Sequence, residues 1–118
     1  MSEIVYYSTP SGRIPVMDYV AGLLKKNKTD DVAAIKLYVD RMEEYGREAN
    51  IIKRNTYKHL DDGIYELRPS DTRIFFFFFQ DGKIIMLHAI EKKRSDIPKG
   101  EIQKAKSERA DYLRRNRK

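Results

Sequence analysis

The sequence predicts an α+β fold in which an antiparallel sheet meander is packed by an N-terminal αα-hairpin and a C-terminal helix. Residues 15–45 place apolar side chains at helical spacing, whereas residues 64–89 form three strand-like runs separated by turn-forming residues. The dipeptide Asp81-Gly82 between the last two runs favours a hairpin, because a type I′ turn needs positive φ at both central positions. Helices segregated from a run of consecutive strands are typical of α+β domains.

Length and composition predict one soluble domain. The 118 residues include 8 Tyr and 5 Phe, which supply enough apolar area for a single core. The absence of cysteine excludes a disulfide scaffold, a thiolate zinc site and a cysteine nucleophile. The longest apolar run, residues 74–79, is far shorter than the roughly 20 residues of a membrane-spanning helix. Because the N-terminus also lacks a signal-peptide pattern, we expect a cytoplasmic protein with no membrane partner.

The chain is expected to begin with a strand followed by a helix. Residues 4–8 are strand-like and end at the turn-forming segment 9–12. A helix is predicted over residues 15–26, and Pro15 suits its first turn because the amide hydrogen that proline lacks has no helical partner there.

A second helix is expected to follow directly and to complete the αα-hairpin. Either Thr29 or Asp30 can cap its start, and Gly46 can end it after residue 45. Residues 47–57 are compatible with a short helical turn or with a loop, and the sequence leaves both alternatives open.

The C-terminal half is expected to contain three strands and one helix. The strands are predicted over residues 64–68, 72–80 and 83–89. Pro98 then opens a terminal helix, with Glu101 near its start, where the helix dipole favours an acidic residue.

Strand pairing predicts that polar residues converge on one face of the sheet. If residues 81–82 form a two-residue loop, Phe75 lies opposite His88 and Arg73 lies opposite Ile90. A four-residue connection before the second strand places Glu66 opposite Phe75. The converging set is then Glu66, Arg68, Arg73, His88 and Lys92.

The same register makes the hairpin end of this face apolar. It pairs Phe79 with Ile84 and Phe77 with Met86, which suits a packing or partner surface. The opposite face is almost wholly apolar and is expected to form the core under the helices. That face carries Tyr65, Leu67, Ile74, Phe76, Phe78, Ile85, Leu87 and Ala89.

The positive charge is concentrated at the C-terminal end. Residues 92–118 contain 11 basic and 4 acidic side chains, a net charge of +7, whereas residues 1–91 contain 13 basic and 14 acidic side chains, a net charge of −1. A basic segment on a small domain is typical of phosphate binding, although a solvated helix surface is an equally ordinary explanation.

Ordinary structural explanations also exist for the converging residues. The glutamate and two arginines can form a cross-strand ion network of little energetic weight. His88 can be a buried sheet histidine with satisfied hydrogen bonds, residues 92–94 can be a charged strand exit, and His59 lies in a segment expected to be a loop. No nucleotide-binding glycine motif, metal-ligand spacing or serine nucleophile motif is present, so no cofactor or metal is expected.

The sequence resembles the RelE superfamily of bacterial toxins, and within it the phage-derived, HigB-like branch. The resemblance extends over residues 64–110, and residues before it agree only in the order of the elements. The motifs that support it are Tyr65-Glu66-Leu67-Arg68-Pro69, Arg73 followed by phenylalanines, Leu87-His88-Ala89-Ile90, Lys92-Lys93, Pro98, and Glu101-Ile102-Gln103-Lys104-Ala105.

This resemblance implies the toxin of a type II toxin–antitoxin system. Such a toxin cleaves mRNA in the ribosomal A site, inhibits translation, and is held inactive by a HigA-like, helix-turn-helix antitoxin. Its metal-independent endonuclease reaction uses attack of the ribose 2′-hydroxyl on the adjacent phosphate, which needs a base, cationic groups on the phosphoryl oxygens and an acid.

The resemblance also implies roles for individual residues. Arg68 and Arg73 are the expected phosphate-binding residues, since a guanidinium presents a planar fork of donors. Glu66, His88 and Lys93 are candidates for the base or acid. Residues expected to bind RNA or the ribosome are Lys92, Arg94, Lys99, Lys104 and Lys106.

One departure and two alternatives accompany this prediction. Some members of the superfamily have a base-stacking tyrosine after the last core strand. This chain has Ser95-Asp96-Ile97-Pro98 there and no tyrosine. The same fold is compatible with a non-catalytic RNA-binding or regulatory module. It is also compatible with an interaction protein that docks through its aromatic hairpin tip.

Overall fold

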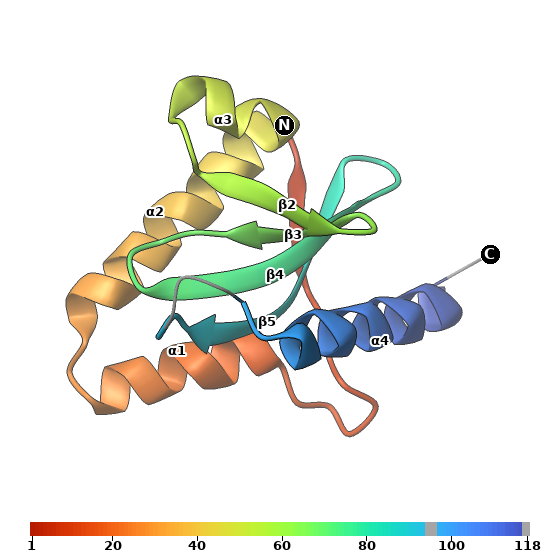
Figure 1. The fold of residues 1–118 in the computed structure, drawn as a ribbon, viewed down its shortest axis with the longest axis horizontal. Helices are drawn as coiled ribbons and strands as arrows, with labels where there is room; N and C mark the ends of the chain where they lie inside the picture. Colours follow the sequence, from red (N-terminus) through yellow and green to blue (C-terminus); the bar gives the residue numbers. More distant parts are fainter. Residues whose placement is uncertain (94–96, 117–118) are drawn as a thin grey trace.

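The computed structural model describes residues 1–93 and 97–116 and contains a five-stranded sheet with helices on both faces (Figure 1). This confirms the α+β prediction. The elements are β1 (Glu3–Tyr6), α1 (Pro15–Lys25), α2 (Thr29–Tyr45), the 3₁₀ turn η1 (Gly46–Glu48), α3 (Ala49–Ile52), β2 (Tyr57–Asp61), β3 (Ile64–Leu67), β4 (Thr72–Phe79), β5 (Lys83–Glu91) and α4 (Lys99–Asn116). None of the helices in the described ranges is long and apolar enough to cross a membrane.

The two N-terminal helices form as predicted, with one correction at a cap. Pro15 is the first residue of α1, and α2 ends at Tyr45 with Gly46, whose φ is 56°, in the cap position. A side chain at Gly46 would meet the N-terminal segment, because its Cβ would lie 2.6 Å from Ser2 Oγ. Neither predicted cap residue of α2 is used. The helix starts at Thr29 itself, with Lys28 in the cap position and no side-chain hydrogen bond there.

The sheet has the order β1-β5-β4-β3-β2 and is mixed rather than wholly antiparallel. The predicted meander is right for β3, β4 and β5, but β1 joins β5 in parallel, with Glu3 opposite Lys83. His59 lies in β2, so its expected placement in a loop is wrong. A strand this short and polar has a weak sequence signal. Its strand conformation is stabilised by pairing with β3 rather than by local propensity.

The outer edge of β2 is closed by an asparagine side chain. The Asn50 amide donates to the Tyr57 carbonyl at 2.9 Å, and the Tyr57 N–H donates to Asn50 Oδ1 at 3.0 Å. Both backbone groups of Tyr57 are therefore satisfied. A further strand cannot pair with β2 at this residue without displacing Asn50.

The β4–β5 register is as predicted near the open end of the hairpin and shifts near its tip. Phe75 lies opposite His88, but beyond an irregularity Phe77 pairs with Ile85 and Phe79 with Lys83. The predicted pairs at the tip are therefore wrong by one residue. Asp81 and Gly82 have positive φ, as expected for the turn. The connection is one residue longer than predicted, because Gln80 belongs to it as well. A β-bulge, in which Leu87 is the extra residue, restores the predicted register from Phe75 to the open end of the hairpin.

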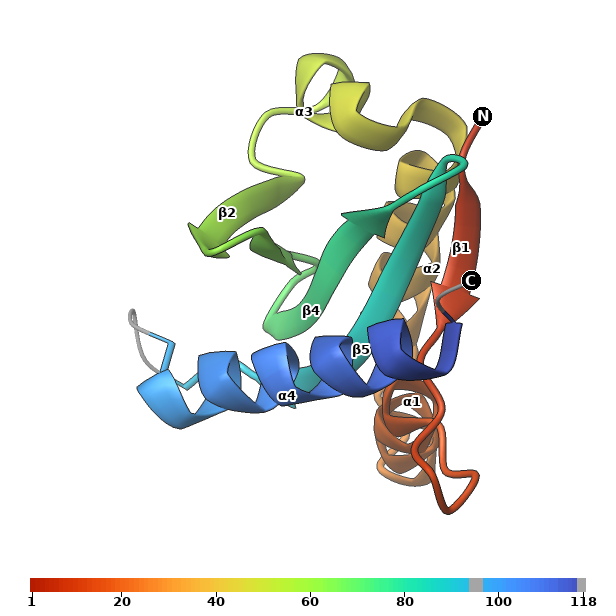
Figure 2. The same cartoon turned by 90° about the vertical axis from the view of Figure 1, so that its right-hand side faces the viewer.

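The bulge changes which residues of β5 face which helices. Ile84 and Met86 pack toward α1 and α2, whereas Ile85 and Leu87 pack toward α4, the reverse of the prediction. Figure 2 shows α4 crossing the sheet below the tip of the β4–β5 hairpin. The hairpin end that was expected to be a packing or partner surface contacts α4 through Phe79, whose ring lies 5.5 Å from that of Tyr112. Its apolar side chains are thus used inside the protein.

A buried tyrosine ties the end of β1 to α4 and gives a measurable alkaline titration. The Tyr7 hydroxyl donates to Asp111 Oδ2 at 2.7 Å. Burial and this carboxylate raise the pKa of Tyr7 from 10.0 to about 12. Because the raised pKa belongs to the folded state, the stabilisation is complete below pH 10.0 and is lost as the pH rises toward 12.

In the absorbance of tyrosinate, we expect Tyr7 to titrate near pH 12, about two units above the ordinary tyrosine pKa of 10.0. The Tyr7→Phe variant should lack this late step and should lose less stability than the wild type between pH 10.0 and 12. An unchanged titration curve in the variant would show that Tyr7 ionises like an exposed tyrosine.

Candidate active site

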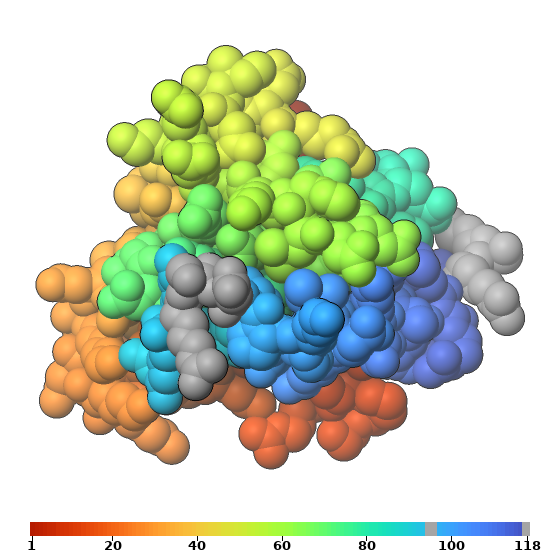
Figure 3. Space-filling view, viewed as in Figure 1, coloured from red at the N-terminus to blue at the C-terminus, as the bar shows by residue number. Residues whose placement is uncertain are grey.

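A cleft of about 390 Å³ lies between the sheet and the first turns of α4. Figure 3 shows the face on which β2 and the start of α4 lie side by side. One carboxylate and five cationic side chains line the cleft, together with three apolar residues. The lining residues are Lys58, Leu60, Glu66, Arg68, Arg73, Lys92, Ile97, Lys99 and Ile102. This excess of positive charge suits an anionic ligand.

Glu66 is the carboxylate at the centre of this charge. Its side chain is only 5% exposed, and its Oε2 lies 3.4 Å from Nε of Arg68. Its Oε1 lies 4.0 Å from Nε of Arg73. Within the described part of the chain, Oε1 has no hydrogen-bond partner. Because buried acceptors are nearly always paired, an unpaired carboxylate oxygen at a charged cleft makes this cleft the candidate functional site.

Arg73 is held in place by the backbone that leads into β4. Its Nη1 donates to the carbonyls of Ser70 at 2.9 Å and Thr72 at 2.8 Å. Burial lowers the pKa of Arg73, and Glu66 opposes that shift, yet a guanidinium remains charged because its ordinary pKa is so high. One cation of the cleft is therefore fixed before any ligand binds.

Arg68 is the more exposed of the two arginines. It follows the last residue of β3, its side chain is 29% exposed, and its Nε faces Glu66. The two guanidinium groups thus flank one carboxylate from either side. This arrangement can bind the oxygens of a phosphate with fork-like hydrogen bonds while Glu66 accepts a proton.

Lys58 is a cleft residue that the sequence prediction missed. It lies on β2 directly opposite Glu66, so both side chains point to the same face of the sheet. The missed signal is Asp62-Gly63, the same turn dipeptide as at the tip of the β4–β5 hairpin, and both of its residues have positive φ. This dipeptide before β3 would have predicted a preceding strand and so a lysine beside Glu66.

Two of the predicted RNA-binding lysines also line the cleft. Lys92 follows β5, and its backbone N–H donates to the Asp71 carbonyl at 2.6 Å. Lys99 is the first residue of α4 and is exposed. The structure therefore brings Glu66, Arg68, Arg73, Lys92 and Lys99 together around one cleft.

His88 shares the face of Glu66 but does not line the cleft. It is 2% exposed, with Nδ1 2.5 Å from Glu108 Oε1 and Nε2 3.0 Å from Glu101 Oε1. Both glutamates belong to α4, which covers this part of the sheet. Each ring nitrogen thus already has a carboxylate partner, and His88 joins α4 to β5.

The remaining predicted residues lie outside the cleft. Lys93 is exposed and lines a neighbouring pocket, and Lys104 is exposed on α4. Lys106 forms an ion pair with Asp61 of β2, with Nζ 2.6 Å from Oδ2. Arg94 lies outside the described residues.

The same ion pair fixes α4 against the β2–β3 hairpin. Lys106 holds the pKa of Asp61 below its ordinary value through their hydrogen bond. Arg109, one turn further along α4, binds the carboxylate of Asp62 at 2.9 Å. These contacts hold one wall of the cleft. Among the residues described, no three His, Asp or Glu side chains form a group that could hold a metal ion.

Comparison with known proteins supplies the family. The model of the family described as "phage derived protein Gp49-like (DUF891)" matches residues 23–110, which extend from the end of α1 into α4 and include every residue that lines the cleft. The chain matches no curated protein. The matched segment is well over half of the chain, so the protein belongs to the phage-derived Gp49-like family, which is a RelE-like, toxin-like family.

Proposed function

We propose that the protein is a HigB-like toxin of a type II toxin–antitoxin system that cleaves mRNA in the ribosomal A site. The observation that supports this most strongly is the unpaired, buried Oε1 of Glu66 between two arginines in a cationic cleft. Family membership supports a toxin-like activity. The proposed partners are the ribosome with its mRNA and a helix-turn-helix, HigA-like antitoxin, and the proposed location is the cytoplasm.

The proposed reaction is an internal transfer of the phosphodiester. The ribose 2′-oxygen forms a bond to phosphorus, the bond from phosphorus to the 5′-oxygen of the next nucleotide breaks, and a 2′,3′-cyclic phosphate results. One proton leaves the 2′-hydroxyl and one is added to the departing 5′-oxygen. No oxidant, reductant or further reactant is needed.

The cleft offers a group for each requirement. Glu66 Oε1 accepts the proton of the 2′-hydroxyl, because no other donor occupies it among the residues described. Arg68 and Arg73 bind the non-bridging phosphoryl oxygens, where negative charge increases in the transition state. The cleft is also lined by Lys58, Lys92 and Lys99, whose ammonium groups are the candidate proton donors for the 5′-oxygen.

Basic residues outside the cleft are proposed to bind the ribosome. Lys104 on α4 has an exposed side chain for ribosomal RNA phosphates. We expect less from Lys106, because its ammonium already pairs with Asp61. Binding through such lysines weakens as salt rises, because bound counterions are released on association.

The test is cleavage of mRNA on programmed ribosomes, with the 5′ ends mapped by primer extension. We expect cuts at the A-site codon with wild-type protein and none on naked mRNA. Arg68→Ala should lower the rate by about 10²–10³-fold, since it removes a donor to the transition state. Arg13→Ala removes an equal charge from an exposed arginine paired with Asp18 and should cleave at the wild-type rate.

Two outcomes would contradict the proposal. Folded wild-type protein that leaves mRNA intact on programmed ribosomes but still binds RNA would indicate a non-catalytic binding module. Equal loss in the Arg68→Ala and Arg13→Ala variants would show that net charge, rather than the cleft, determines the activity.

A further inference from the structure

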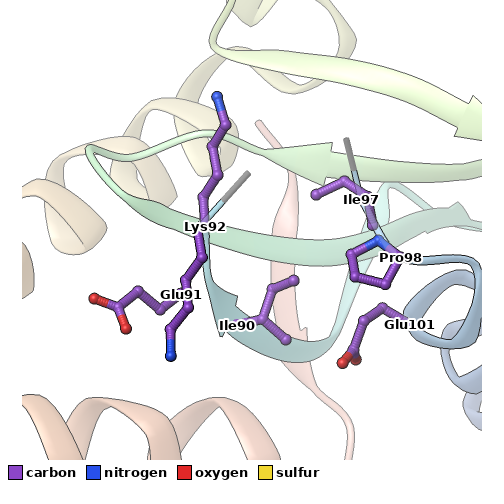
Figure 4. Close-up of a pocket in the computed structure, with 7 residues that line it drawn as sticks. Ile90, Glu91, Lys92, Ile97, Pro98 and Glu101 are labelled. Atoms are coloured by element: carbon purple, nitrogen blue, oxygen red, sulfur yellow. The ribbon is translucent and has the colours of Figure 1, made fainter. Parts of the chain in front are cut away.

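A second pocket adjoins the cleft and has a different chemical character. This side pocket has a volume of about 330 Å³, at the small end of the range of about 300–1,000 Å³ that is usual for ligand sites. Its lining combines apolar side chains with two carboxylates and two lysines (Figure 4). The lining residues are Ile90, Glu91, Lys92, Lys93, Ile97, Pro98 and Glu101.

We propose that the side pocket binds the nucleobase next to the phosphate held in the cleft, and that Glu101 selects guanine there. This inference rests on the proposed function, because it needs RNA in the cleft. It assigns a specificity-determining role to Glu101, which lines the side pocket.

Continuity between the two pockets supports this assignment. Lys92 and Ile97 line both of them, so a nucleotide whose phosphate meets the arginines lies beside the side pocket. Ile90, Ile97 and Pro98 provide apolar contact for the faces of a base. The lysines provide positive charge where the sugar-phosphate chain leaves the pocket.

Glu101 supplies the polar contact that distinguishes one base from another. Its Oε1 lies 3.0 Å from Nε2 of the buried His88, and its side chain is one-third exposed. Glu101 lines the side pocket, so its carboxylate is reached from the pocket as well as by His88. Figure 4 shows the Glu101 carboxylate beside Ile90, with Glu91 on the other side of that isoleucine. His88 is therefore a positioning residue that fixes Glu101 at the side pocket.

A carboxylate at this place favours guanine over uracil. Guanine presents two adjacent donors, N1–H and N2–H, that match the two oxygens of one carboxylate; Oε1 can accept one of them because a carboxylate oxygen has a second lone pair beside its contact with His88. Uracil presents a single N3–H between two carbonyl oxygens, which a carboxylate repels. Adenine and cytosine each present one amino group and should bind with intermediate affinity.

The test is a ¹⁵N NMR titration of the full chain with 3′-GMP, 3′-UMP, guanosine and inorganic phosphate. We expect 3′-GMP to shift the amides of Ile90 and Glu101 and to bind about tenfold more tightly than 3′-UMP, which is the order of selectivity that a two-donor contact provides. Glu101→Gln should reduce this preference to about twofold or less. Glu44→Gln, on the exposed surface of α2, should retain it.

The four probes separate failure of this inference from failure of the proposed function. Equal binding of 3′-GMP and 3′-UMP, with shifts at Glu66 and Arg73 but none at Ile90 and Glu101, would overturn the inference and leave the cleft as a phosphate site. If inorganic phosphate and both nucleotides left Glu66 and Arg73 unshifted, the proposed function would fail. Guanosine tests the side pocket independently, because it has no phosphate; shifts at Ile90 and Glu101 support the inference.

Discussion

Replacing Glu66 by glutamine is expected to lower the rate of mRNA cleavage by about 10²–10⁴-fold, the range attributed to general base catalysis. The glutamine amide keeps the size of the side chain and an oxygen for the neighbouring arginines, but it cannot accept the proton of the 2′-hydroxyl. Arg68 and Arg73 remain, so affinity for RNA should be unchanged or higher. The effect should therefore appear in kcat rather than in KM, measured in single-turnover reactions on programmed ribosomes.

A matched variant separates this effect from a general loss of charge. Glu43→Gln changes an exposed glutamate of α2, remote in the chain from the cleft, and should cleave at the wild-type rate. The thermal unfolding temperatures of both variants show whether the fold remains stable when Arg68 and Arg73 lose the neighbouring negative charge of Glu66. A folded Glu66→Gln protein with undiminished cleavage would exclude Glu66 as the base.

Replacing Phe76 by alanine is expected to reduce the free energy of unfolding by about 3–5 kcal/mol. The Phe76 ring is 0% exposed and is stacked 5.6 Å from Tyr65, with Tyr57 5.7 Å and Phe78 5.4 Å away. Its removal leaves a cavity among rings from β2, β3 and β4. Because a domain of this size has a total stability of about 5–15 kcal/mol, the loss is a large fraction.

Urea denaturation at equilibrium measures this loss, and an exposed residue provides the comparison. Ile51 is 79% exposed on α3, so Ile51→Ala should change the free energy of unfolding by about 0.5 kcal/mol or less. A loss below about 1 kcal/mol for Phe76→Ala would mean that neighbouring rings fill the cavity.

The fold was predictable where local periodicity decides it. The pairs Arg73–Ile90 and Phe75–His88 were predicted from a two-residue loop, and they are found because the longer connection through Gln80 and the bulge at Leu87 offset each other. The sequence pattern could not reveal the bulge at Leu87. Residues 84–87 are all apolar, so shifting them by one position leaves apolar side chains on both faces of the strand. The parallel partner of β1 was also beyond reach, since a strand of four residues has no pattern that specifies its neighbour.

The sequence was enough to predict which sheet residues form the site, but not that α4 would cover some of them. Glu66 and Arg73 were placed together by strand register alone, and the structure has them around one cleft. His88 obeys the same register, yet α4 lies over it and provides two glutamate partners. The position of a helix across a sheet depends on tertiary packing, which the period of the strands does not encode.

The parallel pairing of β1 with β5 has a consequence for synthesis of the chain. Glu3 pairs with Lys83, so β1 gains its partner only after both N-terminal helices and three further strands have been translated. Contacts between residues so distant in sequence slow folding, because a long loop must close before they form. We therefore expect β1 to remain unpaired in the nascent chain until β5 has been translated, and the parallel β1–β5 pair to form after the β3–β4 and β4–β5 hairpins.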